Sequence, residues 1–301
     1  MSKALVTGGA GFIGSNLVDK LLSLGHTVVV LDNESAISNS QFYWNPMAEN
    51  HKVDITDYKA IEPLFAGVDY VFHAAAEARV QPSIENPSLA LATNVLGTAN
   101  VLQASLNARV KRVIYSMTSS VYGNSNPTPN VETQTPDCMT PYSISKYTGE
   151  QLCRMYSNLY NLETVSLRYF NVYGFREPSK GVYAPVVSKF INQHKAGEFL
   201  TIVGDGEQRR DFTHIDDVVS ANIAVMNYSE ELKAEVFNIG AGRNFSINEL
   251  AQLISNKYKY LPFRPGEARE TLADNSKAKR VLHWIPQVRL EDYIKESLSS
   301  S

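Results

Sequence analysis

Cysteine is almost missing from this sequence of 301 residues, which contains only Cys138 and Cys153. Two cysteines cannot form a disulfide framework, so the fold must depend on its hydrophobic core. The six histidines are scattered, without the HExxH or the paired cysteine and histidine spacing of a zinc site. The sequence therefore predicts neither a disulfide-rich protein nor a metal site.

Long apolar runs and an excess of one charge are also missing. No apolar stretch reaches the length of a membrane span, and the first residues, KALVTGG, enter a strand at once without room for a signal peptide. The 28 basic and 31 acidic residues nearly cancel, giving a formal net charge of −3. These features argue against a membrane or nucleic-acid surface, and we expect a cytoplasmic globular protein.

Glycine is concentrated where the chain begins. The stretch ALVTGGAGFIGSNLVDKLLSLGHTVVVLDN reads as a strand, a glycine-rich turn, an amphipathic helix and a second strand. In a dinucleotide-binding unit, Gly8 would permit the tight turn, Gly11 would let the backbone approach a pyrophosphate, and Gly14 would let the helix close on the strand. The helix start would then offer free N–H groups to phosphate. The alternative is a glycine-rich turn of an ordinary α/β protein.

The end of the second predicted strand indicates which dinucleotide binds. Asp32 stands where a carboxylate hydrogen-bonds the adenosine ribose. No lysine or arginine occurs from Leu21 through His51, so a 2′-phosphate would meet a carboxylate and no basic partner nearby in sequence. We therefore expect NAD rather than NADP.

Further strand-like runs follow at the spacing of a doubly wound sheet. They read HKVDI, DYVFHAAA, RVIYSMTSSVYG and ETVSLRYFN, and helical stretches such as LALATNVLGTANVLQASLN separate them. The pattern predicts an α/β fold, a parallel Rossmann sheet with helices on both faces. We expect it to occupy residues 1–170, with later segments returning to it.

The stretch TPYSISKYTGE places Tyr142 and Lys146 four residues apart, on one face of a predicted helix. Taken alone, the pair could be a lysine stem that covers an aromatic ring at the surface. Its meaning depends on the rest of the chain.

Seven motifs occur in a fixed order: TGGAGFIG, HAAA, NVLGT, SMTSSVYG, YSISK, RYFNVYG and GDGEQRRDFTHIDDV. Together they closely resemble the extended short-chain dehydrogenase/reductase superfamily, and within it the nucleotide-sugar epimerases of the UDP-glucose 4-epimerase type. The resemblance implies that Tyr142 and Lys146 are catalytic, together with Thr118, four residues before the tyrosine of VYG. It also implies NAD as the cofactor and a homodimer paired through helices, for which residues 94–106 are a candidate.

The chemistry of this pair agrees with a catalytic role. A lysine ammonium about 4 Å from a tyrosine, at an effective dielectric constant of about 20, contributes on the order of 4 kcal/mol. That is about the energy needed to bring the pKa of Tyr142 from near 10 to near neutrality, so that the phenolate can act as a base. We expect Lys146 also to hold the nicotinamide ribose, and Thr118 to orient the reacting hydroxyl.

The resemblance implies further cofactor contacts. Asp54 would flank the adenine, although a solvated carboxylate at a strand end is the alternative, and His73 is expected to be a core residue. The other implied contacts are Phe12, Ile13, Asn33, Ile55, Ala74, Ala75, Ala76, Asn94, Ser116 and Tyr169.

After RYFNVYG the composition changes, and the resemblance implies that residues 171–301 form a smaller substrate-binding lobe. Asn171 would contact the diphosphate, and so would Arg210 and Arg264, because guanidinium groups suit phosphate oxygens. Surface ion pairs are the alternative for both arginines. Glu267 would accept a hydrogen bond from the uridine ribose. Thr271 would line the sugar pocket and leave room for an acetamido group, unless the loop that carries it has shifted.

The residues after Thr118 discriminate between possible reactions. Related 4,6-dehydratases carry an acid pair there and related decarboxylases a glutamate, whereas this chain has Ser119 and Ser120. We therefore expect C4 epimerisation of a nucleotide hexose such as UDP-glucose, and with it the N-acetylated sugar. A 4-ketosugar reductase and a non-catalytic NAD-sensing protein are the alternatives.

Overall fold

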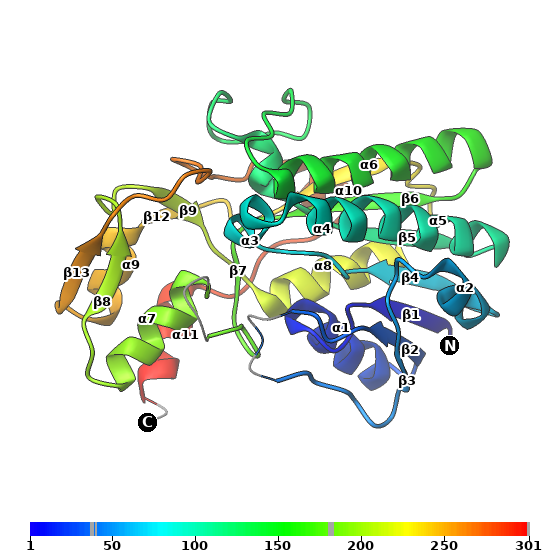
Figure 1. The fold of residues 1–301 in the computed structure, drawn as a ribbon, viewed down its shortest axis with the longest axis horizontal. Coiled ribbons are helices and arrows are strands. Elements are labelled where there is room, and N and C mark those ends of the chain that lie inside the picture. Colours follow the sequence, from blue (N-terminus) through cyan, green and yellow to red (C-terminus); the bar gives the residue numbers. More distant parts are fainter. Residues whose placement is uncertain (37–38, 40, 180–183, 300–301) are drawn as a thin grey trace.

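The computed structural model describes residues 1–36, 39, 41–179 and 184–299, and it is built around one parallel sheet (Figure 1). Seven strands pair in the order β11-β6-β5-β4-β1-β2-β3, with every pairing parallel. The predicted Rossmann sheet is confirmed. The strands are β1 (Lys3–Thr7), β2 (Thr27–Asp32), β3 (Glu49–Lys52), β4 (Tyr70–His73), β5 (Arg112–Thr118), β6 (Thr164–Tyr169) and β11 (Glu235–Ile239).

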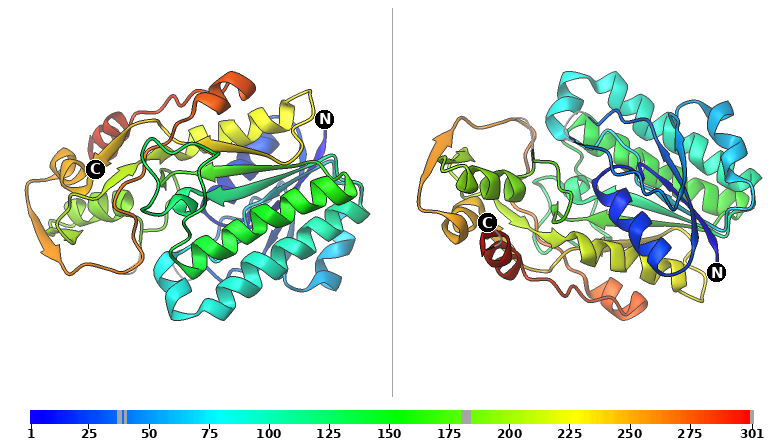
Figure 2. Two further views of the ribbon diagram at one scale, coloured as in Figure 1. Left: turned by 90° about the horizontal axis from the view of Figure 1, so that it is seen from above. Right: turned by 90° about the horizontal axis from the view of Figure 1, so that it is seen from below.

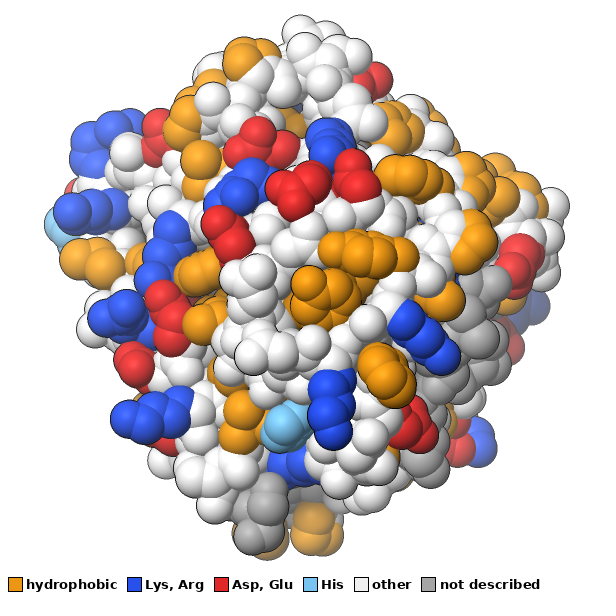
Figure 3. All heavy atoms as spheres, turned by 90° about the vertical axis from the view of Figure 1, so that its left-hand side faces the viewer, with side chains coloured by type: hydrophobic (Ala, Val, Ile, Leu, Met, Phe, Trp, Pro, Cys, Tyr) orange, Lys and Arg blue, Asp and Glu red, His pale blue; other side chains and the backbone are white. Residues whose placement is uncertain are grey.

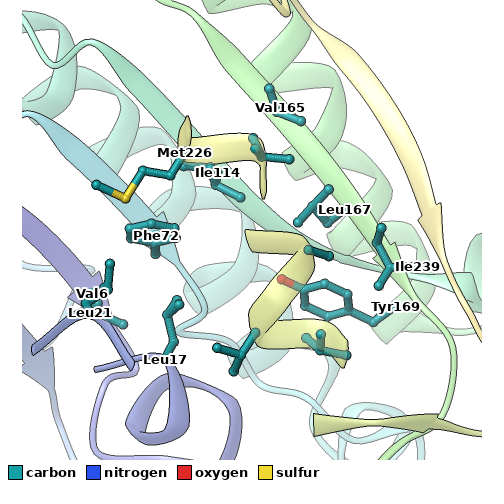
Figure 4. Packing of buried hydrophobic residues seen from close by; sticks show 14 of the residues in the cluster. Val6, Leu17, Leu21, Phe72, Ile114, Val165, Leu167, Tyr169, Met226 and Ile239 are labelled. Carbon is teal, nitrogen blue, oxygen red and sulfur yellow. The ribbon is translucent and has the colours of Figure 1, made fainter. Parts of the chain in front are cut away.

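Helices cover both faces of the sheet (Figures 1 and 2). Side chains alternate along each strand, so Ala4 and Val6 of β1 enter one core cluster and Leu5 enters the other. Figure 4 shows part of the first cluster, where Leu17 and Phe72 lie on the same side of the sheet. Helices α1 (Phe12–Ser23), α8 (Ile215–Asn227) and α10 (Ser276–Leu282) pack on the first face; α2 (Tyr58–Ile61), α5 (Gly97–Asn107) and α6 (Pro141–Tyr160) pack on the second.

The predicted helical stretch over residues 89–107 is interrupted by a wider turn. After α3 (Val80–Glu85), the chain forms α4 (Pro87–Leu91), a π-helical turn (Ala92–Leu96) and then α5. The turn carries the buried Asn94, whose amide accepts from Glu77 N at 2.8 Å and donates to the Ser145 hydroxyl at 2.9 Å. A π-helical turn re-aims a side chain within a helix, and here it lets Asn94 tie the chain after β4 to helix α6.

Helix α6 has a well-defined start. The Thr140 hydroxyl accepts from Ser143 N, and the Ser143 hydroxyl in turn accepts from Thr140 N, which forms a reciprocal capping box. Pro141 occupies the first turn, where its missing N–H has no consequence. This cap fixes Tyr142 and Lys146 on the first two turns of the helix.

A second lobe lies at the carboxyl edge of the sheet. It has its own core cluster, which includes Phe190, Ile202 and Leu250, and its outer face presents basic, acidic and apolar side chains side by side (Figure 3). The chain also returns from it to the main sheet as β11, so the division at 170/171 stays a prediction. The lobe's elements are α7 (Val186–Lys195), α9 (Ile247–Ile254), α11 (Leu290–Ser299), β7 (Val172–Tyr173), β8 (Leu200–Val203), β9 (Arg209–Asp211), β10 (Thr213–His214), β12 (Asn244–Ser246) and β13 (Tyr258–Leu261).

In the described part of the chain, no helix has both the length and the apolar character needed to cross a membrane.

A buried ion pair joins helix α6 to the sheet. Arg168 of β6 donates from Nε and Nη2 to the two carboxylate oxygens of Glu150, at 2.9 and 2.7 Å, and the side chains are only 3% and 2% exposed. Nη1 of Arg168 also donates to the Tyr122 hydroxyl at 2.9 Å. Because every partner is in place, the pair fixes α6, which carries Tyr142, against β6.

We expect Glu150→Ala to destabilise the protein by about 3–5 kcal/mol, because it leaves the Arg168 guanidinium buried without its counter-charge. The free energy of unfolding in urea measures this loss. Asp205→Ala is a suitable control, since it removes one partner of an exposed ion pair with Arg269 and should change stability little. Equal effects of the two substitutions would contradict the proposed role of the buried pair.

Candidate active site

A cavity of about 570 Å³ opens at the carboxyl edge of the sheet and extends to the second lobe. Ligands of open parallel sheets bind at this edge. Most of the predicted site residues line it, from both sides. They are Gly8, Gly11, Phe12, Ile13, Gly14, Asp32, Asn33, Ile55, Ala74, Ala75, Ala76, Thr118, Tyr142, Tyr169, Asn171, Arg210, Arg264, Glu267 and Thr271.

The glycine turn forms one end of the cavity and leaves no room for side chains. Gly8 has φ +67°, and a Cβ there would lie 2.7 Å from Ala75 N. A Cβ on Gly14 would lie 2.1 Å from the Gly8 carbonyl oxygen, so only glycine lets α1 approach the strand this closely. A Cβ on Gly11 would lie 3.3 Å from the nearest of these protein atoms, the Gly8 carbonyl oxygen, and the other side of Gly11 is open to a ligand.

Helix α1 begins at Phe12 without a side-chain cap on its first N–H groups. These donors and the positive end of the helix dipole suit a pyrophosphate. The turn and the uncapped helix start together fit a dinucleotide.

Asp32 ends β2 at the cavity wall. Its carboxylate accepts from Ala10 N at 3.1 Å and from Glu34 N at 2.8 Å, and burial raises its pKa. The carboxylate thus holds the glycine turn and the strand end together, and its remaining lone pairs are left for a ribose hydroxyl. Its place at the end of β2 agrees with the predicted ribose contact.

Asp54 does not line the cavity. Its carboxylate accepts from Thr56 N at 2.8 Å and from the Asn33 amide at 2.7 Å. These bonds hold the pKa of Asp54 below its ordinary value, although burial acts in the opposite direction. The direct adenine contact of Asp54 stays a prediction; in this structure Asp54 positions Asn33, which lines the wall.

Asn94 and Ser116 also lie behind the wall. All the amide atoms of Asn94 bond to Glu77 and Ser145, and the Ser116 hydroxyl lies 3.3 Å from the Tyr169 hydroxyl, which covers it. Neither side chain lines the cavity in this structure, and their expected cofactor contacts stay predictions.

Tyr142 and Thr118 meet at the cavity wall, from α6 and the end of β5 respectively. Burial raises the pKa of Tyr142, whereas its hydrogen bond with the Thr118 hydroxyl and the charge of Arg79 lower it. The predicted tyrosine and threonine therefore lie together. The arrangement can move a proton between Tyr142 and a substrate hydroxyl.

Lys146 is buried behind the cavity wall, and its expected contact with the nicotinamide ribose stays a prediction. Its Nζ lies 4.1 Å from the centre of the Tyr115 ring, its side chain is 2% exposed, and burial lowers its pKa to about 7. It does not line the cavity, and the nearby cation that lowers the pKa of Tyr142 is Arg79. The sequence-based estimate counted the attraction between Lys146 and Tyr142 but left out the cost of burying the ammonium.

Several of the expected substrate contacts are bonded within the protein. Asn171 donates both amide hydrogens, to Asp211 O at 2.9 Å and to the Thr271 hydroxyl at 3.0 Å, so a contact between its side chain and a diphosphate would replace one of these bonds. That contact stays a prediction. Arg210 lies 3.5 Å from Glu267, and both line the cavity.

Four charged residues of the cavity wall escaped the sequence analysis: Glu77, Arg79, Glu177 and Lys189. Arg79 closely follows β4, and the carboxyl ends of parallel strands hold ligands, so its position was a usable signal. Glu177 and Lys189 lie in the chain after β7, where no pattern pointed to them. Among the described residues, no group of His, Cys, Asp and Glu side chains could hold a metal ion.

A Rossmann sheet, a glycine turn that fits a dinucleotide and a Tyr142–Thr118 pair define a dinucleotide-dependent enzyme class. Residues 4–240 match the family described as the NAD dependent epimerase/dehydratase family, and the chain belongs to it. Its cofactor is NAD.

Individual relatives cover nearly the whole chain. The crystal structure of UDP-glucose 4-epimerase from Thermotoga maritima with UDP-glucose has a TM-score of 0.92 and 38% identity, and the match covers 99% of this chain and 97% of that one. UDP-glucose 4-epimerase of Mycolicibacterium smegmatis is 35% identical over 98% of this chain and 97% of its own length. UDP-glucuronate 4-epimerase of Thermodesulfobacterium geofontis is 34% identical over 100% and 96%.

We expect Gly11→Ala to weaken NAD binding by at least about tenfold, because the added methyl group stands where the backbone approaches the pyrophosphate. The fold should survive, since the nearest of the flanking protein atoms is 3.3 Å from the added Cβ. Calorimetry on NAD-free protein measures the affinity. Ser23→Ala, at the exposed far end of α1, is the control. Unchanged NAD affinity of Gly11→Ala would show that the pyrophosphate binds elsewhere.

Proposed function

We propose that this protein is a nucleotide-sugar 4-epimerase, which interconverts UDP-glucose and UDP-galactose through a 4-keto intermediate. The observation that carries the proposal is the Tyr142–Thr118 pair, which lies on the wall of a cavity that joins the glycine turn to an arginine-bearing lobe. Two of the relatives described above are named UDP-glucose 4-epimerases, which supports the same reaction.

The glycine turn and Asp32 would hold NAD, which when bound would supply a reversible acceptor for the hydride from C4. Tyr142 takes the proton of the 4-hydroxyl and later gives it back, while Thr118 orients that hydroxyl by hydrogen bonding. The positive charge of Arg79 favours the ionised tyrosine, which opposes the effect of burial on its pKa. Lys146, whose Nζ lies over the Tyr115 ring, would hold the nicotinamide ribose.

The wall beside Thr118 supplies hydroxyl groups rather than acids. Thr118 accepts from Ser120 N at 3.1 Å and caps the short 3₁₀ turn Ser119–Tyr122. Neither Ser119 nor Ser120 can supply the carboxylate that elimination or decarboxylation uses at this place. Epimerisation needs only a hydride transfer, a turn of the ketosugar and the reverse transfer, and these residues suffice for it.

The substrate contacts form the other half of the proposal. We propose that Arg210 and Arg264 bind the diphosphate and that Glu267 accepts from the uridine ribose. Glu267 lies 3.5 Å from Arg210 in this structure, so a bound substrate would have to insert between these two oppositely charged side chains. Lys189, whose pKa is lowered by burial and by the charge of Arg264, adds a third basic group to the same wall.

A homodimer remains part of the proposal, with a changed surface. Within residues 94–106 most apolar side chains pack inward, for example Val101 and Leu102. Exposed apolar side chains gather instead on the π-helical turn, α4 and α6, with Leu96, Leu91 and Leu159 among them. We propose this α4–α6 surface as the one that pairs.

We expect Tyr142→Phe to reduce turnover by about 10²–10⁴-fold, because it removes the acid–base group and keeps the ring. NMR detection of UDP-galactose formed from UDP-glucose measures the rate. Tyr147→Phe, on the same helix, is the matched control and should stay active. An active Tyr142→Phe variant would contradict the mechanism, and steady accumulation of NADH would indicate a net oxidoreductase instead.

Activity on the N-acetylated sugar tests whether Thr271 leaves room for an acetamido group in the sugar pocket. This residue lines the cavity, and its hydroxyl accepts from Asp211 N at 3.2 Å. We expect UDP-N-acetylglucosamine to be accepted, and Thr271→Tyr to depress it selectively, because overpacking the pocket costs about 1–3 kcal/mol. Rates on both sugars measure the effect. Thr271→Ser keeps the hydroxyl and should retain both activities. Equal losses on the two sugars would show that Thr271 is not the gate.

A further inference from the structure

Two charged side chains of opposite sign, Glu177 and Arg79, lie on the cavity wall. Glu177 is only 9% exposed, and neither of its carboxylate oxygens has a hydrogen bond of good geometry among the described residues, although the N–H groups of Gly174 and Ser188 face it. The charges of Arg79 and Glu177 act on each other. Buried polar groups are normally paired, so poorly paired acceptors beside a guanidinium group on a cavity wall indicate a ligand that supplies a donor.

Arg79 is electrostatically connected to both Tyr142 and Glu177. Its charge acts on both groups, lowering the pKa of each. Glu177 acts on Arg79 and on Tyr293 of α11. Arg79 is therefore near enough to influence both the reacting hydroxyl and Glu177.

A sugar hydroxyl matches this pair better than a carboxylate does. A hydroxyl can donate to Glu177 and accept from Arg79 at the same time. When Glu177 is ionised, the two charges offset each other, so the pair attracts a further anion only weakly. A carboxylate on the sugar would then stand against the carboxylate of Glu177, and such like-charge contacts are unfavourable.

On the basis of the proposed epimerase function, we propose that Arg79 and Glu177 bind hydroxyl groups of a neutral hexose and, when Glu177 is ionised, discriminate against hexuronic acids. Glu177 and Arg79 are then specificity-determining residues of the sugar pocket.

Protonation makes the discrimination depend on pH. Burial raises the pKa of Glu177 to about 8, while the charge of Arg79 and the N–H groups of Gly174 and Ser188 act in the opposite direction. Tyr293 faces Glu177 from α11. Below this pKa the acid is protonated and can donate to a uronate. Above it the ionised Glu177 repels a uronate, so selectivity for the neutral sugar grows as the pH rises.

The protonation state of Glu177 also predicts that a proton is released when the sugar nucleotide binds. At neutral pH the free protein holds the proton on Glu177. A hydroxyl that donates to the carboxylate stabilises its ionised form and so lowers the pKa of Glu177. Binding of UDP-glucose should therefore release a proton, and binding of UDP, which lacks the sugar, should not release it.

Calorimetry on the NAD-bound protein tests these expectations with UDP-glucose, UDP-glucuronate and UDP. The preference for UDP-glucose over UDP-glucuronate should grow at least about tenfold between about pH 6.5 and about pH 9. Titrations in buffers of different ionisation enthalpy measure the released proton. A preference that is the same at both pH values, or the absence of proton release, would overturn the proposal.

Glu177→Gln keeps the shape of the side chain and removes its titration. It should abolish the proton release and make the preference independent of pH, with UDP affinity unchanged. Glu77→Gln is the matched control, because Glu77 lines the same cavity but feels the charge of Asp54 rather than that of Arg79. It should keep both effects. Persistence of the pH dependence in Glu177→Gln would overturn the proposal.

Arg79→Gln supplies an independent variant. It should weaken the binding of UDP-glucose at both pH values and leave the binding of UDP unchanged. Equal weakening of the binding of both ligands would contradict sugar binding by Arg79.

NMR assays on the same preparations separate the two proposals. Selective binding without epimerisation would overturn the proposed function alone, whereas epimerisation of UDP-glucose without the selectivity would overturn only this inference.

Discussion

The close contact between Gly8 and Gly14 is the constraint on which the rest of the site depends. A single added Cβ at Gly14 would stand 2.1 Å from the Gly8 carbonyl oxygen, so α1 packs on β1 only because that atom is missing. This packing brings the uncapped start of α1 to the carboxyl edge of the sheet. The parallel register then brings Asp32 and the segment after β4 to the same edge, and the cavity follows.

The wall of the cavity owes its shape to a second layer of residues. Asn94 holds the backbone of Glu77 and the Ser145 hydroxyl, and Ser116 lies behind Tyr169. The buried Arg168–Glu150 pair fixes α6 from the other side. These polar groups are bonded to one another, so they position the wall.

The sequence was sufficient to predict the parallel sheet and most of the wall, because glycine spacing and strand periodicity are local signals. It was not sufficient where an outcome depends on burial or on competing partners. Burial lowers the pKa of Lys146 to about 7, and the side-chain amide of Asn171 donates both of its hydrogens to Asp211 and Thr271. Neither effect can be read from spacing. Glu177 lies in a segment without a periodic pattern, and only the tertiary structure brings it to the cavity.

The return of the chain to the main sheet has a consequence during synthesis. Strand β6 pairs on one side with β5 and on the other with β11, whose residues are made only after those of α7, β8 and α8. Until Glu235–Ile239 leave the ribosome, one side of β6 is an unpaired edge made of buried-type residues such as Val165 and Leu167. Such edges are templates for aggregation, so the growing chain must protect β6 until its last partner arrives.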